Sequence, residues 1–333
     1  MISNVDELPV QVRAKRLWWS RYSQDLVLIG VLILLVAAFA VRSPYFLTRG
    51  NFSNLLLSVS ALGSMAAVST ILVIGRGIDL SLGSVCAFCA MLTALAVEQY
   101  HWPWAAGLAF GLLAGGLCGA VNGFVVSKIG ISPIITTIAT LSIFRGLAYV
   151  TNDGQPVLVQ NDALIYLGSG SFVGIPVAVW ILLVVMVLCA WIATQTRIGR
   201  GVFAVGASPR AAFIAGLPVP VYRFWLYVAS GVSAALAGAL ILGQSGTATP
   251  SAAVSYELWV ITAVLLGGTS LNGGSGSVGK TALGVIIIGV LNNGMVLLTV
   301  PAFYQIIANG LLLLLAVIAD QLRFRKGTVL LEG

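Results

Sequence analysis

Long apolar runs separated by short polar breaks form the main pattern along this chain. A helix that crosses a bilayer needs about 20 predominantly apolar residues, so each long run is a candidate span. Ten such segments are predicted, at 24–41, 52–75, 79–97, 103–127, 131–151, 174–194, 223–244, 253–268, 278–298 and 302–320. The pattern predicts an all-α polytopic membrane protein with about ten transmembrane helices. Its transmembrane domain is expected over 24–320, between the polar segments 1–23 and 321–333.

The segment 253–268 is the weakest of the ten, because it is short and begins with the polar residues Ser255, Tyr256 and Glu257. If it entered the membrane without crossing, the basic C-terminal tail would face the outside. Lys and Arg concentrate on the cytoplasmic side of membrane proteins, so a full crossing is the favoured interpretation.

Composition and charge agree with this class and give an orientation. Hydrophobic residues make up 59% of the chain and charged residues only 8%, whereas soluble domains carry about 25% charged residues. With the N-terminus inside, ten crossings leave Arg42 and Arg49 outside and place most other Lys and Arg residues inside. Both termini and the loop 195–223 are therefore predicted to be cytoplasmic, and the loop 152–173 to lie outside.

The same residues argue against several functions. Cytoplasmic loops account for the net charge of +7, so no nucleic-acid partner is expected. The four cysteines lie in apolar segments and His101 is the only histidine, so no metal site is expected. No catalytic group of Ser or Cys with His and Asp can be assembled, so the chain is not expected to be an enzyme.

The loop 195–223 carries the signals of a complete short helix. Ser208 is a good N-cap, Pro209 suits the first helical position, and Gly216 suits the residue just beyond the end. The candidate residues of this helix are Ser208, Pro209, Arg210, Ala211, Ala212, Ala215 and Gly216. Its three alanines would leave the helix narrow, so that a soluble partner could approach the backbone closely.

A short internal echo indicates a possible inverted repeat. Asn122-Gly123, followed by a Ser-Pro at 132–133, resembles Asn293-Gly294, followed by a Val-Pro at 300–301. The copies lie five predicted crossings apart. Because this number is odd, the two copies would have opposite orientations relative to the membrane. In transporters built from inverted repeats, the substrate path lies at the repeat interface.

Five motifs together resemble a known family. They are Gly77 to Ser84 (GIDLSLGS), Asn122-Gly123, Gly206 to Leu217, Leu266 to Gly276 (LGGTSLNGGSG) and Leu291 to Gly294 (LNNG). In this order they resemble the ribose-type sugar permeases of bacterial ABC importers, the inner-membrane components of binding-protein-dependent transport systems. The resemblance runs from about the first span to the C-terminus. Permeases for nucleosides, autoinducers and branched-chain amino acids are related, so the motifs indicate the family more specifically than the solute.

The resemblance implies a permease that moves a ribose-like monosaccharide into the cell by alternating access, in the bacterial plasma (inner) membrane. It implies a cytoplasmic ABC ATPase subunit, an extracytoplasmic sugar-binding protein and a second permease copy, identical or closely homologous, in a lipid bilayer. The short helix at 208–216 would then be the coupling helix that seats on the ATPase. Arg210 departs from the family, whose members often carry an acidic residue there, which puts any specific ion pair with the ATPase in doubt.

No cofactor is expected in this chain, and ATP and Mg are expected in the partner ATPase. Gly274 to Thr281 fits the Walker A pattern by letter. That pattern needs a preceding strand and a following soluble helix, whereas apolar spans flank it here. The match is therefore interpreted as chance in a Gly-rich turn.

Four polar residues are candidates for the translocation path: Asp79, Asn122, Asn293 and Gln305. Ionisable residues within a membrane are costly and often functional, and amides can bond sugar hydroxyls in both directions. Each residue also has a structural interpretation. Asp79 can cap the third helix or pair with Arg76, and the amides can bond neighbouring helices.

Two other classes of function are weighed against the importer. An ion-coupled secondary transporter would need a buried charged relay, and few carboxylates lie within the predicted spans. A channel would need a filter-like repeat, which the sequence does not contain. Co-purification with an ATPase discriminates the importer from the secondary transporter.

Overall fold

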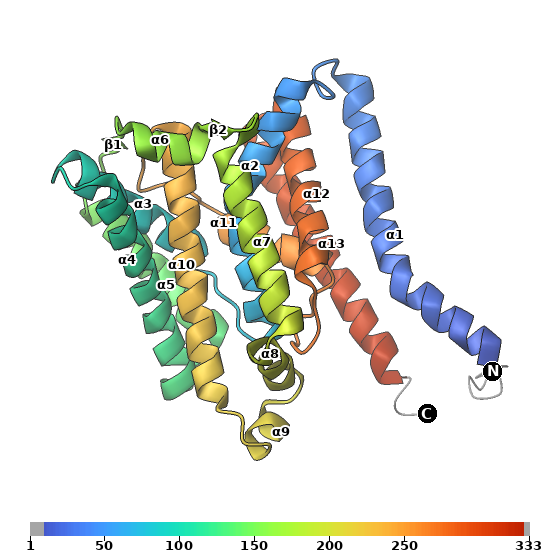
Figure 1. The fold of residues 1–333 in the computed structure, drawn as a ribbon. Coiled ribbons are helices and arrows are strands. Elements are labelled where there is room, and N and C mark those ends of the chain that lie inside the picture. The colour runs from blue at the N-terminus through green and yellow to red at the C-terminus, as the bar shows by residue number, and fades with distance from the viewer. Residues whose placement is uncertain (1–9, 330–333) are drawn as a thin grey trace.

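The computed structural model describes residues 10–329, with side chains from residue 26 to residue 321. Helices form almost all of this part of the chain (Figure 1), which confirms the predicted all-α class. Within it, seven helices are long and apolar enough to cross a membrane: Arg49–Ile74, Trp104–Ile129, Pro133–Val150, Val177–Gln195, Val219–Ser245, Val278–Leu297 and Ala302–Gln321. Three shorter apolar helices are Leu26–Arg42, Leu82–Glu98 and Tyr256–Leu266. These helices follow the ten predicted segments in order, and the number of full crossings stays a prediction.

The first half of the chain forms five main helices, whose bounds are α1 (Val10–Arg42), α2 (Arg49–Ile74), α3 (Leu82–Glu98), α4 (Trp104–Phe124) and α5 (Pro133–Val150). A π-helical turn, η2 (Val125–Ile129), extends α4. Thr48 caps α2, because its hydroxyl accepts from the backbone N–H of Asn51 at 3.3 Å. Proline at the first position of α5 matches the preference of helix starts for proline.

The second half supplies five more main helices: α7 (Val177–Gln195), α10 (Val219–Ser245), α11 (Tyr256–Leu266), α12 (Val278–Leu297) and α13 (Ala302–Val329). Two short helices, α8 (Arg197–Ala207) and α9 (Pro209–Ile214), occupy one end of the molecule, which we call the α9 end (Figure 1). The opposite end, called the β1 end, carries α6 (Asp162–Ser169) and four two-residue strands. The strands are β1 (Val157–Leu158), β2 (Ser171–Phe172), β3 (Ile175–Pro176) and β4 (Thr247–Ala248), paired as β1 with β4 and β2 with β3.

The packing of the helices follows the inverted repeat suggested by the sequence. Helix α3 packs on α4, α5 and α10. In the same way, α11 packs on α12, α13 and α2, which are the corresponding helices of the other half. Likewise, α10 packs on α4 as α2 packs on α12. In Figure 1, α2 runs from the β1 end toward the α9 end and α10 runs in the opposite direction. The two halves, offset by five main helices, are therefore arranged in opposite directions, as the echo at Asn122 and Asn293 predicts.

Two predicted segments differ in their helix bounds from the structure. The helix predicted from residue 79 begins at Leu82, because residues 75–81 form a break after α2. The segment predicted at 253–268 is helical only over Tyr256–Leu266, and 11 residues span only about 16 Å at 1.5 Å per residue. A Gly-rich loop, 267–277, follows it. Helix α1 runs without interruption from Val10, so it begins before the predicted span 24–41, and the boundary of the transmembrane domain after residue 23 stays a prediction.

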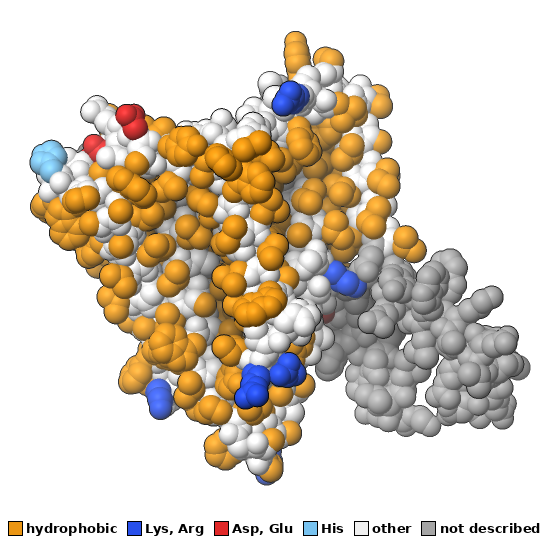
Figure 2. Space-filling view, viewed as in Figure 1, with side chains coloured by type: hydrophobic (Ala, Val, Ile, Leu, Met, Phe, Trp, Pro, Cys, Tyr) orange, Lys and Arg blue, Asp and Glu red, His pale blue; other side chains and the backbone are white. Residues whose placement is uncertain are grey.

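The distribution of charge along the described surface agrees with the predicted orientation, which remains a prediction. Figure 2 shows a broad hydrophobic surface, with Lys and Arg side chains mostly toward the α9 end and also near the connection between α1 and α2, and with acidic side chains at the β1 end. Helix α1 begins and α13 ends toward the α9 end (Figure 1). The basic side chains counted in the segments 1–23 and 321–333 lie outside the described side chains.

Candidate functional site: the α9 helix and the buried polar clusters

Helix α9 has the ends that the sequence predicts. The hydroxyl of Ser208 accepts from the backbone N–H of Ala211 at 3.3 Å, and Pro209 occupies the first helical position. The helix ends at Ile214, and Gly216 follows with φ of +85°. Such a left-handed conformation favours glycine, which has no Cβ to clash. The predicted helix between Ser208 and Gly216 is therefore confirmed as a structural element.

The two faces of α9 differ from the simple narrow helix expected. Ala212 is buried among Val205 of α8 and Val219 of α10, so this alanine is not available to a partner. Ala211, Ala215 and Arg210 are exposed, together with Phe213 and Ile214, whose side chains are 70% and 77% exposed. The outward face is therefore apolar as well as narrow. The sequence reasoning missed Phe213 and Ile214 because it concentrated on the small residues.

Asp79 lies at the centre of a buried polar cluster in the break between α2 and α3. Its Oδ1 accepts from the N–H of Ser81 at 2.9 Å and from the Ser81 hydroxyl at 2.6 Å. Its Oδ2 accepts from the hydroxyl of Ser230, on α10, at 2.7 Å. The expected pairing with Arg76 is wrong, because the Arg76 guanidinium donates to the carbonyls of Gly206 and Ala207 instead. Hydroxyl and amide donors therefore surround this carboxylate.

Asn122 belongs to the same cluster. Its Nδ2 donates to the hydroxyl of Ser81 at 2.9 Å, and its side chain is fully buried. The Oδ1 of Asn122 has no hydrogen-bond partner among the residues that the structure describes. An unsatisfied buried acceptor of this kind is uncommon and calls for an explanation such as a water or a ligand. The structure thus brings two candidate path residues, Asp79 and Asn122, to one place.

Asn293 lies elsewhere, near the β1 end of α12. It exchanges two hydrogen bonds with Asn51 of α2, at 2.9 and 2.8 Å. Gln305, on α13, donates from Nε2 to the carbonyl of Val300 at 3.0 Å. On the next turn, Asn309 donates to Asn292 Oδ1 at 2.8 Å. Asn293 and Asn309 therefore link neighbouring helices, whereas Gln305 bonds the loop before its own helix. The role of Asn293 and Gln305 in a path remains a prediction.

Tyr227 escaped the sequence reasoning. The hydroxyl of Tyr227 accepts from the N–H of Ile78 at 3.3 Å and donates to its carbonyl at 3.1 Å, so this fully buried side chain holds the break. Tyr227 and Ser230 are three residues apart on α10, a spacing that places them on one helical face and could have indicated their shared role. Arg145 donates to the carbonyls of Pro250 and Ala252 at 2.7 and 2.8 Å.

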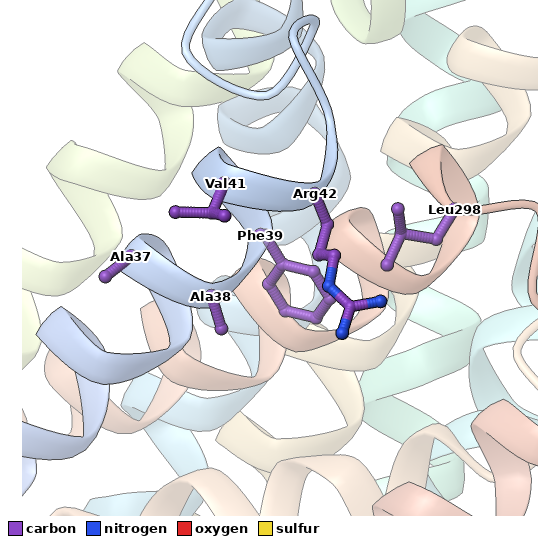
Figure 3. A pocket seen from close by; sticks show the side chains of 6 residues that line it. All are labelled: Ala37, Ala38, Phe39, Val41, Arg42 and Leu298. Atoms are coloured by element: carbon purple, nitrogen blue, oxygen red, sulfur yellow. The ribbon is translucent and has the colours of Figure 1, made fainter.

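Two surface cavities lie away from all of these residues. The larger, about 540 Å³, lies between α1 and the residue that follows α12 (Figure 3). Its lining residues are Ala37, Ala38, Phe39, Val41, Arg42 and Leu298. The second, about 440 Å³, lies along exposed apolar side chains of α7. Both linings are mostly apolar, which suits grooves filled by lipid tails, and neither contains a candidate path residue.

The described residues contain no group of three or more His, Cys, Asp or Glu side chains that could hold a metal ion. The four cysteines are free and buried. The Walker-like segment is also internal packing: Gly274 N–H donates to the carbonyl of Ile74 at 2.8 Å, and the hydroxyl of Thr281 lies 2.8 Å from that of Thr70. The N–H of Gly274 and the hydroxyl of Thr281, which a phosphate cradle would need free, are therefore engaged in internal packing.

Comparison with known proteins places the chain in a family. The family model for the branched-chain amino acid transport system / permease component matches residues 51–317. The chain is 37% identical over 297 residues to the L-arabinose ABC transporter permease protein of Azospirillum brasilense, covering 89% of this chain and 87% of the relative. It is 37% identical over 314 residues to the ribose import permease protein of Bacillus subtilis, covering 94% and 97%. For the D-allose transport system permease protein of Escherichia coli the identity is 35% over 309 residues, covering 92% and 93%.

No solved structure matches the chain. The family match covers α2 to most of α13, and the relatives are covered almost end to end. The chain therefore belongs to the branched-chain amino acid transport system / permease component family, as a multi-pass protein of the bacterial inner membrane.

Proposed function

We propose that this chain is the permease subunit of an ATP-driven importer that moves a monosaccharide into the cell by alternating access. The observation that carries the proposal is the similarity, over nearly the full length, to permeases named for arabinose, ribose and allose. The family model bears the name of branched-chain amino acids, but these relatives are named for sugars. Permeases for amino acids, nucleosides or autoinducers are therefore not favoured, and neither is an ion-coupled transporter.

The chain would work with three protein partners. A cytoplasmic ATPase subunit would bind ATP and Mg, an extracytoplasmic binding protein would deliver the sugar, and a second permease copy would complete the membrane unit. The permease itself would carry no ATP, so it is not an enzyme on its own. In this proposal, residues 1–23, 195–223 and 321–333 face the cytoplasm.

The α9 helix is proposed as the contact with the ATPase. Its outward side chains Phe213 and Ile214 are the largest exposed apolar groups of the helix, beside Arg210, Ala211 and Ala215. Burying an exposed aromatic and a branched aliphatic side chain in a groove of a soluble partner is favourable, because apolar area leaves water. Ala212 would act from inside, by keeping α9 seated on α8 and α10.

The path is proposed to involve the four candidate residues, with two kinds of support. Asp79 and Asn122 share one buried cluster at a helix break, and breaks of this kind form transporter sites. Asn293 and Gln305 support the proposal more weakly, because Asn293 is bonded to Asn51 of α2 and Gln305 to the loop carbonyl of Val300.

The test is transport by the intact complex. The tagged chain is purified from its native membrane, its co-purifying ATPase is identified, and the complex is reconstituted with its binding protein. Uptake of labelled pentoses, hexoses and nucleosides is then measured with and without ATP. ATP-dependent uptake of one sugar is expected. Uptake that follows an ion gradient and ignores ATP would overturn the proposal.

The coupling contact is tested by changing its outward face. The double substitution Phe213→Ser with Ile214→Ser should weaken co-purification of the ATPase by about tenfold or more, because aromatic anchors often dominate an interface. Ile129→Ser is the matched control, since this exposed apolar residue lies on η2 rather than α9. Equal recovery of the ATPase from both variants would remove the coupling role from α9.

A further inference from the structure

The side chain of Arg76 joins the short helix α8 to the helix break of the first repeat. Its Nε donates to the carbonyl of Gly206 at 2.6 Å, and its Nη2 donates to the carbonyl of Ala207 at 3.1 Å. These carbonyls end α8, where a helix leaves its last acceptors unpaired and carries a partial negative charge. A guanidinium with two donors suits this position better than a single ammonium.

The backbone around this contact is packed without space for side chains. A Cβ on Gly206 would overlap the carbonyl oxygen of Ile74, the last residue of α2, and would lie 2.6 Å from the backbone nitrogen of Gly274. Gly274, in the Gly-rich loop 267–277, donates its N–H to the same Ile74 carbonyl at 2.8 Å. The ends of α2 and α8 and the Gly-rich loop therefore meet at one point beside Arg76.

Helix α8 is in turn firmly attached to α9. Ser208 ends α8, since its N–H donates to Ala204, and it also caps α9 through its hydroxyl. Ala212 packs between the two helices, against Val205. A displacement applied to the exposed side of α9 would therefore move α8 with it.

The other side of the break is attached to α10. Ile78 is bonded through both its N–H and its carbonyl to Tyr227, and Asp79 is bonded to Ser230. Arg76 lies between these anchors and α8. Its φ is +63°, a left-handed conformation that is strained for a residue with a side chain. The break thus keeps an arginine where glycine would be less strained.

We propose that Arg76 is a positioning residue that transmits the movement of α8 and α9 to the break between α2 and α3. The proposal rests on the proposed importer function, and it assigns the transmission to one side chain. When the ATPase displaces α9, the end of α8 pulls on the guanidinium, and the segment 75–81 follows. Without this contact, ATP hydrolysis and the opening of the path would proceed separately.

The variant Arg76→Gly tests this directly. Glycine accepts the positive φ without strain, which offsets part of the stability lost with the two hydrogen bonds, so the variant should still fold and assemble. The expected result is a fall of about fivefold or more in sugar transported per ATP hydrolysed, with ATPase association preserved. Arg76→Lys keeps the charge but loses the two-donor geometry, and it should lie between glycine and wild type. Lys128→Gln, on exposed η2, controls for the loss of one positive charge and should keep the wild-type ratio.

The outcomes separate the two proposals. If the wild-type complex shows no ATP-dependent sugar uptake, the proposed function fails. If the wild type transports and Arg76→Gly transports with the same sugar-to-ATP ratio, the role of Arg76 is overturned. If Arg76→Gly does not assemble, the ratio of Arg76→Lys decides, and a wild-type value for it overturns the proposal.

Discussion

Asn122 and Asn293 occupy matching positions of the two repeats, but their surroundings are unlike. Asn122 is fully buried and donates to Ser81, in a cluster that holds the carboxylate of Asp79. Asn293 is partly buried and exchanges two hydrogen bonds with Asn51 on a neighbouring continuous helix. The two helices therefore carry an amide at corresponding places in unlike chemical surroundings.

The difference separates a charged cluster at a break from a neutral pair between helices. A carboxylate away from water needs several donors to offset its lost hydration, and Asp79 has three from Ser81 and Ser230. The Asn51–Asn293 pair carries no charge, and a helix-to-helix hydrogen bond in a membrane protein contributes only about 0.6 kcal/mol on average. The two sites should therefore respond to substitution with very different magnitudes.

Asp79→Ala should have the largest effect. It leaves the N–H and hydroxyl of Ser81 and the hydroxyl of Ser230 without their acceptor. A buried donor without a hydrogen-bond partner costs about 1 to 3 kcal/mol of stability. We expect most of the folded protein to be lost, measured as the monodisperse fraction of a fluorescent fusion in size-exclusion chromatography. Asp79→Asn, which keeps the size and one acceptor oxygen, should give an intermediate amount. Normal folding of Asp79→Ala would contradict the structural role of the cluster.

Asn122→Leu should have a smaller effect at the same cluster. It removes one hydrogen bond to Ser81 together with an Oδ1 that the described residues leave unsatisfied, so the expected destabilisation is about 1 kcal/mol. Thermal unfolding of the purified variant measures this cost. If Asn122 also lines the path, sugar uptake per folded complex falls as well. Unchanged uptake would leave Asn122 as a packing residue.

The sequence predicted the main helices well, because a membrane span is set by composition over about 20 residues. It also predicted α9, since Ser208, Pro209 and Gly216 act through local backbone geometry. The eighth segment was predicted too long at 253–268. Hydropathy does not distinguish a short helix from an apolar loop beside it, and the structure confines the helix to Tyr256–Leu266.

The polar contacts could not be predicted in the same way. The partners of Asp79 include Ser230, 151 residues away along the chain, and no local pattern reports such a contact. Pairing of Asp79 with Arg76 was one interpretation from the sequence, but the guanidinium donates to the end of α8, 130 residues away. Tertiary packing likewise decides that the side chain of Ala212 faces inward, against Val205 and Val219.

The neutral pair should show the smallest effect, and a double-mutant cycle can isolate it. Asn51→Leu and Asn293→Leu each break both hydrogen bonds and leave the opposite amide without them. The coupling energy that the cycle isolates should be about 0.6 kcal/mol, and at most about 1.7 kcal/mol, of unfolding free energy in mixed micelles. The double variant leaves neither amide of the pair without a partner, because both amides are gone. It should therefore lose less unfolding free energy than the sum of the losses of the two single variants. A strictly additive loss would mean that the pair does not contribute to stability.

The same position also tests whether Asn293 lines the path. In a background without the four native cysteines, Asn293→Cys should be reached by a small hydrophilic thiol reagent only if water enters between α2 and α12. The described pairing with Asn51 occupies that contact, so a packing residue would stay unreactive. Reaction at a rate that sugar or nucleotide alters, together with reduced uptake by a normally folded Asn293→Leu, would assign Asn293 to the path. An unreactive cysteine combined with normal uptake would assign it to packing, and the two asparagines of the repeat would then differ in function as well as in surroundings.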